Sequence, residues 1–137
     1  MSSSDLTHLL WLISVLAPSV ALYLNARALS LSTYVQFCDK FSEQFRRLKN
    51  CAPDDDWGYE FGELLNLTEN ACHIYRSWIV WGTTGRLLRD YLVDVIRGIN
   101  SESNTRRAVV MGITSNTTYN EIDKFAASQG IRFLEKP

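Results

Sequence analysis

Histidine and recognisable catalytic motifs are scarce in this chain of 137 residues. It contains two histidines, His8 and His73, and neither has a cysteine or a second histidine at the spacing of metal ligands. The chain has no nucleophile elbow, no phosphate-binding loop and no dinucleotide fingerprint. The acidic run Asp54 to Asp56 lacks the glycine turn and the distal glutamate of a calcium loop. We therefore expect no enzyme, no metal site and no cofactor.

Cysteine and net charge are also low. The three cysteines, Cys38, Cys51 and Cys72, are an odd number at unrelated spacings, which is typical of reduced thiols in a core rather than of a disulfide framework. Basic residues number 14 and acidic residues 15, so the formal net charge is -1. The chain has no global positive field to recruit nucleic acid. We expect an oligonucleotide ligand only through a partner protein.

Charge is missing altogether from one long segment, the 21 residues from Leu6 to Ala26. As a helix, its core from Leu6 to Leu24 covers about 28 Å, close to the ~30 Å hydrocarbon thickness of a bilayer. We therefore predict an N-terminal transmembrane anchor in residues 1–26. Two alternatives are a buried helix of a soluble protein and a cleaved signal peptide, because Ala26-Arg27-Ala28 has the small-x-small pattern of a cleavage site.

Polar side chains of this segment gather on one side of the predicted helix, called here the polar arc. A lone helix in lipid gains nothing from such a division, so the polar arc is expected to face protein or water. Either like helices pack closely through it, or it lines an aqueous pore with His8 near the outer mouth. At about 100° per residue, the polar arc comprises Thr7, His8, Ser14, Pro18, Ser19 and Asn25.

Basic residues follow this segment, and none precedes it. Arg27 is the first, and Lys40, Arg46, Arg47 and Lys49 come next. Because positively charged flanks stay in the cytoplasm, we expect the N-terminus outside and residues 27–137 inside. Those residues are enough for one cytosolic helical domain.

The rest of the chain has helical periodicity. No glycine or proline interrupts residues 28–50, so this helix can continue directly from the span. The predicted class is therefore all-α, with one N-terminal transmembrane helix and a small cytosolic helical bundle. Further predicted helices are Trp57–Tyr75, Thr84–Asn100 and one that a Thr118/Glu121 capping box begins and Gly130 ends, while Ala108–Ile113 is a short strand or a helix tail.

Apolar residues recur along residues 24–48 in alternating steps of four and three, called here the apolar seam. Such a heptad pattern is typical either of the buried stripe of an antiparallel bundle or of a coiled-coil stalk between copies. After Leu24 and Ala28, the apolar seam comprises Leu31, Val35, Cys38, Phe41, Phe45 and Leu48.

Two other segments carry candidate contacts. Trp78 and Trp81 lie between the second and third predicted helices, and we expect both to fill the core, since exposed tryptophans would mark an interface. Arg106 and Arg107 follow an expected polar loop at Ser101–Thr105. This pair could bind a phosphate or an anionic partner, and solvated loop charge is the alternative.

Three stretches resemble a broad bacterial family with one N-terminal span and a small helical cytosolic domain: residues 61–75, Arg89–Leu92 and Thr118–Phe125. The resemblance covers residues 6–128, and the family has no catalytic residues to carry over. Proteins similar in size and layout include membrane effectors of phage-defence operons, among them the channel-forming effector of the Hailong system. The resemblance implies a homo-oligomer in the bacterial inner membrane. It also implies a cytosolic regulatory protein, nucleotidyltransferase-like, that silences the effector directly or through its oligonucleotide product.

Two functions follow from these expectations. In the first, several copies assemble, their polar arcs face a common axis, and a change in the helical domain opens an ion path that depolarises the membrane. In the second, the chain is a membrane anchor or adaptor that recruits a cytosolic partner, and the span only packs against its neighbours.

Overall fold

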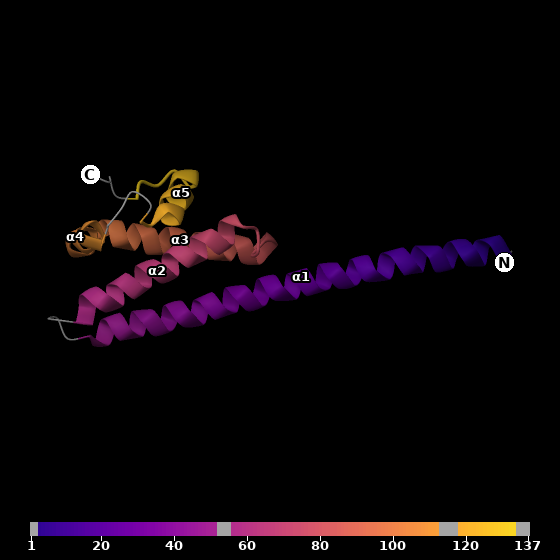
Figure 1. The fold of residues 1–137 in the computed structure, drawn as a ribbon, viewed down its shortest axis with the longest axis horizontal. Helices are drawn as coiled ribbons and strands as arrows, with labels where there is room; N and C mark the ends of the chain where they lie inside the picture. Colours follow the sequence, from indigo (N-terminus) through magenta and orange to yellow (C-terminus); the bar gives the residue numbers. More distant parts are fainter. Residues whose placement is uncertain (1–2, 52–55, 113–117, 134–137) are drawn as a thin grey trace.

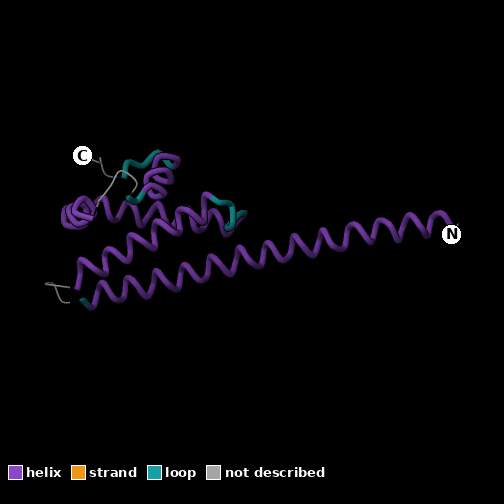
Figure 2. Tube along the Cα trace, in the orientation of Figure 1, coloured by secondary structure: helices purple, strands orange, loops and turns teal. Residues whose placement is uncertain are grey.

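A computed structural model describes residues 3–51, 56–112 and 118–133 of the chain. All regular structure within these ranges is helical, as Figures 1 and 2 show. The helices are α1 (Ser3–Asn50), α2 (Asp56–Arg76), α3 (Gly82–Ser101), α4 (Ser103–Gly112) and α5 (Asn120–Ser128). The predicted all-α class is confirmed.

Helix α1 is one uninterrupted helix of 48 residues, in which Pro18 is an internal position. At about 1.5 Å per residue it is about 72 Å long. Its N-terminal half projects alone beyond the other helices, whereas its C-terminal half lies along them (Figure 1). The predicted continuation of the apolar segment into residues 28–50 is confirmed, and the boundary drawn at residues 26 and 27 falls inside one helix.

Helices α2 to α5 and the C-terminal half of α1 form the bundle. Helix α2 is its centre, since it contacts each of the other four helices. The core is built from the periodic apolar faces predicted for α2 and α3, and α5 closes it through Ile122 and Phe125. Its largest fully buried apolar side chains are Phe41, Phe125, Leu65, Leu88, Leu92, Ile96, Ile122, Val80 and Val109.

The face of α1 that packs on the bundle is shifted from the apolar seam. It includes two polar residues, Ser30 and Gln44, which are buried. Ser30 Oγ lies 2.6 Å from Thr84 Oγ1, and Gln44 Nε2 donates to the backbone oxygen and the carboxylate of Glu60 at 2.7 and 2.6 Å. These hydrogen bonds offset the cost of burying polar groups and thereby fix which face turns inward.

A tight turn, Ser77–Trp81, joins α2 to α3. Trp78 and Gly82 both have left-handed backbone conformations, with φ of 59° and 63°. At Gly85, an added Cβ would lie 3.0 Å from the Val80 carbonyl oxygen, so a larger residue there would force the turn to move by a few tenths of an ångström. The prediction that Trp78 and Trp81 fill the core is wrong: Val80 is buried instead, Trp81 is half-buried, and Trp78 is 82% exposed.

The expected loop at Ser101–Thr105 is also wrong, because only Glu102 separates α3 from α4. Thr105 Oγ1 donates to the carbonyl oxygens of Ile99 and Glu102, at 2.6 and 2.8 Å, and this ties the first turn of α4 to the end of α3. Residues 108–112 belong to α4, so this segment is a helix tail rather than the alternative short strand. Ile113 lies outside the described residues.

Helix α5 receives its N-terminal cap from another helix. Its N-cap residue is Tyr119, one position later than the predicted Thr118, and the Tyr119 side chain makes no capping hydrogen bond. The backbone N–H groups of Glu121 and Ile122 donate to the two carboxylate oxygens of Glu69 on α2, both at 2.8 Å. The predicted stop is confirmed, since Gly130 is left-handed and Ile131 N–H donates to Ala126 O at 2.9 Å.

Candidate functional site: the exposed length of helix α1

All six residues of the polar arc lie on the part of α1 that the bundle leaves uncovered, and all are exposed. Within the described residues α1 is the one helix long and apolar enough to cross a membrane. An 18-residue window of this helix has a mean hydropathy of 1.5, and none of that window is buried inside the molecule. The polar arc is therefore available to contacts outside the chain.

Two serines of the polar arc satisfy their hydroxyl donors within α1. Ser14 Oγ donates to Trp11 O at 2.7 Å, and Ser19 Oγ donates to Val15 O at 2.9 Å. Each oxygen keeps acceptor capacity for another group. Pro18 has no N–H, so the Ser14 carbonyl lacks the usual partner four residues on. The middle of the arc thus presents acceptors rather than unpaired donors.

The apolar seam divides between the core and the surface. Phe41 is fully buried, with its ring centroid 5.1 Å from that of Tyr91, while Cys38 and Leu48 are half-buried. Three other members, Leu31, Val35 and Phe45, are 52%, 47% and 41% exposed. The seam residues therefore lie partly in the core and partly on an uncovered face of α1.

The uncovered seam residues continue an apolar face of the N-terminal half. We name Leu24, Leu31 and Val35 the exposed stripe; Leu24 is 55% exposed. Toward the N-terminus the stripe meets a shallow hollow of about 450 Å³ over the small residues Ala17 and Ala21. Small residues four apart allow close approach of a second helix. One apolar surface thus runs along α1 from the hollow to Val35.

A second apolar surface lies on the bundle. A groove of about 450 Å³ opens between the end of α1, α2, α3 and the start of α4, with Phe45, Trp57 and Phe61 among its walls and Asp94 and Glu102 beside them. The Trp57 and Phe61 rings are stacked, with centroids 5.0 Å apart. The groove is a surface on which an apolar segment of another protein could pack.

Arg106 and Arg107 lie on α4 rather than in a loop, and both are exposed. They are not among the residues that line the groove or the pockets around the α2–α3 turn. The structure places them at a solvent-facing position, where the interpretation as a contact for an anionic partner stays a prediction.

The charged side chains between α2 and α5 act structurally. Glu121 receives hydrogen bonds from Arg76 and from Lys124, the latter at 3.1 Å. Partial burial opposes ionisation of Glu121, but these two cations outweigh it and hold the pKa of the carboxyl below its usual range. Burial raises the pKa of the neighbouring Cys72 thiol, which therefore stays protonated and unreactive. Among the described residues, no group of three His, Cys, Asp or Glu side chains could hold a metal ion.

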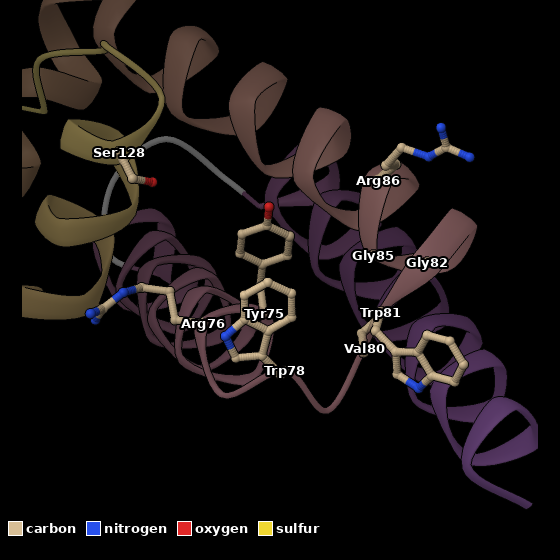
Figure 3. A pocket seen from close by; sticks show the side chains of 9 residues that line it. All are labelled: Tyr75, Arg76, Trp78, Val80, Trp81, Gly82, Gly85, Arg86 and Ser128. Atoms are coloured by element: carbon tan, nitrogen blue, oxygen red, sulfur yellow. The ribbon is translucent and has the colours of Figure 1, made fainter. Parts of the chain in front are cut away.

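The pocket drawn in Figure 3 lies beside the α2–α3 turn and has a volume of about 370 Å³. Trp78 stands at one side of it, Arg76 extends toward α5, and the Arg86 side chain extends outward from α3. A neighbouring pocket of about 470 Å³ contains Tyr23 and Arg27 of α1 and shares Trp81 and Gly82 with the first. Sequence reasoning placed both tryptophans inside and missed this surface.

No family model matches the chain, and no curated protein or solved structure matches it either.

Proposed function

We propose that the chain is a single-span membrane protein whose copies associate along α1 and together form an ion-conducting effector, with the bundle as its control element. The observation that carries this proposal is the exposed stripe. The apolar surface of α1 does not end where its uncharged segment ends, at Ala26, but continues to Val35 without being covered by the bundle.

Lipid can cover only part of this surface. Val35 lies eight residues beyond Arg27, about 12 Å along the helix, whereas the headgroup layer on each side of a bilayer is about 5–8 Å thick. Val35 then faces water in a monomer, while Leu31 lies at the outer edge of the headgroup layer. Because Leu24, Ala28, Leu31 and Val35 follow a heptad spacing, a second α1 is the partner whose shape suits them.

Association through the exposed stripe leaves the polar arc uncovered. The stripe and the arc occupy different faces of α1 at about 100° per residue, so contact through one does not bury the other. A single span cannot enclose a pore, whereas several copies can turn their arcs toward a common axis. The bundle is joined to each span by continuous helix, which favours its role as the element that controls the opening.

The proposed setting is the inner membrane of a bacterium, with the N-terminus outside and the bundle in the cytoplasm. The basic residues after Arg27 support that orientation. The role in phage defence and the silencing by a cytosolic regulatory protein come from the resemblance of residues 61–75, Arg89–Leu92 and Thr118–Phe125 to the membrane effectors. The groove beside Trp57 and Phe61 is a surface on which such a regulator could act.

A second candidate function, a membrane anchor or adaptor, is favoured by the hydroxyl geometry. The Ser14 and Ser19 donors are already satisfied within α1, which lowers the cost of exposing them to lipid or to a packed helix. In that case the polar arc needs no water, and the chain serves to hold the partner of the bundle at the membrane.

Ion flux through liposomes that contain the full chain separates the two. Ser14→Leu or Ser19→Leu places a bulky apolar side chain on the polar arc and should block conduction by closing and dewetting a narrow lumen, while insertion and association continue. Ile13→Leu and Val20→Leu, on the apolar side, are the matched controls and should conduct like the parent. Equal flux from all four variants would refute the pore. Association without any flux in the parent chain would favour the anchor.

A further inference from the structure

We propose that the α2–α3 turn rests in the headgroup layer of the leaflet from which α1 emerges, and that Arg27 and Arg86 bind anionic phospholipid there. This inference rests on the proposed membrane span. It assigns a second, lateral membrane contact to the bundle, separate from α1 itself. The surface consists of Trp78, Ile79 and Trp81 with these two arginines, and we name it the interfacial turn.

The interfacial turn is fixed to α1 at a defined height. Ser30 is buried and accepts a hydrogen bond from Trp81 N–H at 3.1 Å, and its hydroxyl also pairs with Thr84 at 2.6 Å. About two turns earlier on α1, the Tyr23 ring meets the Trp81 ring edge-on, with centroids 5.6 Å apart. The turn is therefore attached to residues 23–30 of α1, at the end of the bundle nearest the projecting half of that helix (Figure 1).

That height coincides with the membrane interface. The uncharged segment ends at Ala26, and the headgroup layer beyond the hydrocarbon is about 5–8 Å thick, which corresponds to about four or five residues of helix. The layer then extends from Ala26 to about Ser30 or Leu31. Ser30 lies near its outer boundary, and Tyr23 lies three residues, about 4.5 Å, on the hydrocarbon side of Ala26, so a turn attached to both lies across the headgroup layer.

The side chains of the interfacial turn suit that environment. Trp78 is 82% exposed, although its backbone adopts a left-handed conformation that is strained for a bulky residue. In water, the exposed Trp78 ring and its strained backbone contribute no stabilising interaction. Tryptophan has an apolar ring and one N–H donor, and it is the residue most typical of membrane interfaces. Ile79, next to it, is 38% exposed and adds apolar surface.

The charge of this surface is positive. Within the part of the chain that the structure describes, neither Arg27 nor Arg86 forms an ion pair with an acidic side chain; Arg86 donates only to Thr83 Oγ1, at 3.4 Å. The nearby Arg76 and Arg89 are different, because they pair with Glu121 and Asp90. The two unpaired guanidinium groups flank Trp81 and Gly82, each beside one of the two pockets. A phosphate headgroup with net negative charge complements them.

Nitroxide labels on the full chain in vesicles of phosphatidylcholine and phosphatidylglycerol test this placement. The background carries Cys38→Ser and Cys51→Ser, because these two partly exposed thiols would react with the label. Cys72 is retained, since it is buried and its thiol does not label. Ile79→Cys reports on the turn and keeps both tryptophans. Leu16→Cys, on the apolar side of α1, reports on the hydrocarbon, and Met111→Cys, on exposed α4, reports on water. We expect the label at position 79 to be less accessible to a water-soluble nickel chelate and more accessible to oxygen than the label at position 111, with values between those at positions 111 and 16.

The outcomes separate this inference from the proposed span. A label at position 79 that is as accessible to nickel as the one at position 111, while position 16 is shielded, overturns the interfacial turn and leaves the span standing. Nickel access at position 16 overturns the span and the inference together.

Two substitutions test the side chains themselves. Arg27→Gln and Arg86→Gln should each lower the ratio of shielded to accessible label about fivefold in vesicles with phosphatidylglycerol and change nothing in phosphatidylcholine alone. An equal effect in both lipids contradicts binding of anionic lipid. Trp78→Ala should also raise nickel access at position 79, whereas Tyr59→Ala, at another largely exposed aromatic residue on α2, should not.

Discussion

Replacing Phe41 by alanine tests whether the bundle depends on the C-terminal half of α1. The Phe41 ring is fully buried, meets the Tyr91 ring edge-on at 5.1 Å and lies 6.4 Å from the rings of Phe37 and Phe45. Val35, six residues earlier on the same helix, is 47% exposed and provides the matched control.

The expected loss follows from burial. Truncation of a buried phenylalanine to alanine typically costs about 3–5 kcal/mol, because the transfer free energy of the ring is lost and a cavity remains. A single domain has about 5–15 kcal/mol of total stability, so Phe41→Ala removes a large part of it. Val35→Ala should change the free energy of unfolding by less than about 0.5 kcal/mol, since alanine favours helix and little packing is lost in the monomer.

Urea unfolding of the full chain in mild detergent, followed by tryptophan fluorescence, measures both changes. We expect a large decrease of the transition midpoint for Phe41→Ala and almost none for Val35→Ala. Chemical crosslinking in vesicles should give the opposite order, with association weakened by Val35→Ala because this residue lies on the exposed stripe. Equal midpoints for the two variants would contradict the burial argument, and unchanged crosslinking in Val35→Ala would remove the stripe from the interface.

Three further outcomes are expected. Glu69→Ala should destabilise α5 by about 1–3 kcal/mol, because two N–H groups lose their carboxylate, and faster amide exchange over residues 120–128 would reveal it; unchanged exchange would contradict the cap. Because the pKa of Glu121 is lowered in the folded state, its ionised carboxylate stabilises the fold above the unfolded pKa of about 4.3, and this stability is lost as the pH falls through the folded pKa. The melting temperature of Glu121→Gln should therefore decrease less between about pH 5 and 3 than that of the parent chain. Parallel curves for the two proteins would contradict this. A periplasmic reporter fused after Pro137 should stay inactive, and activity would reverse the proposed orientation.

The helical elements could be predicted because their signals are local. The spacing of apolar residues in α2 and α3 placed the predicted ends within about two residues of the observed ones, and Gly130 marked the end of α5. The continuity of α1 followed from the absence of glycine and of any proline after Pro18 up to residue 50. The short link at Glu102 was missed because serine and asparagine favour turns, whereas here the Thr105 hydroxyl closes the junction of α3 and α4.

The face that α1 turns to the bundle could not be predicted from apolar spacing. The deciding residues are polar, since Ser30 and Gln44 become buried only because Thr84, Trp81 and Glu60 supply partners from distant parts of the chain. Glu69 is a similar case, as nothing in the sequence around it indicates that it caps α5. For Trp78, hydrophobicity favoured the core, but the left-handed turn points the side chain outward. The burial of these side chains therefore depends on contacts with residues far away in the sequence, which local patterns do not show.

Helix α1 runs without interruption from the proposed span into the bundle, so one continuous helix joins the two parts. Between Pro18 and residue 50 no glycine or proline interrupts the helix, so a rotation of the bundle about the helix axis also turns Pro18, Ser19 and Asn25 of the polar arc. The relative phase of the two ends is then set by residue count alone: one alanine inserted after Asn25 advances the arc by about 100° and lifts it about 1.5 Å, while seven inserted residues return it close to its starting direction. If activity varies with the number of inserted residues with this helical period, the bundle and the proposed span are coupled through rotation of α1 itself.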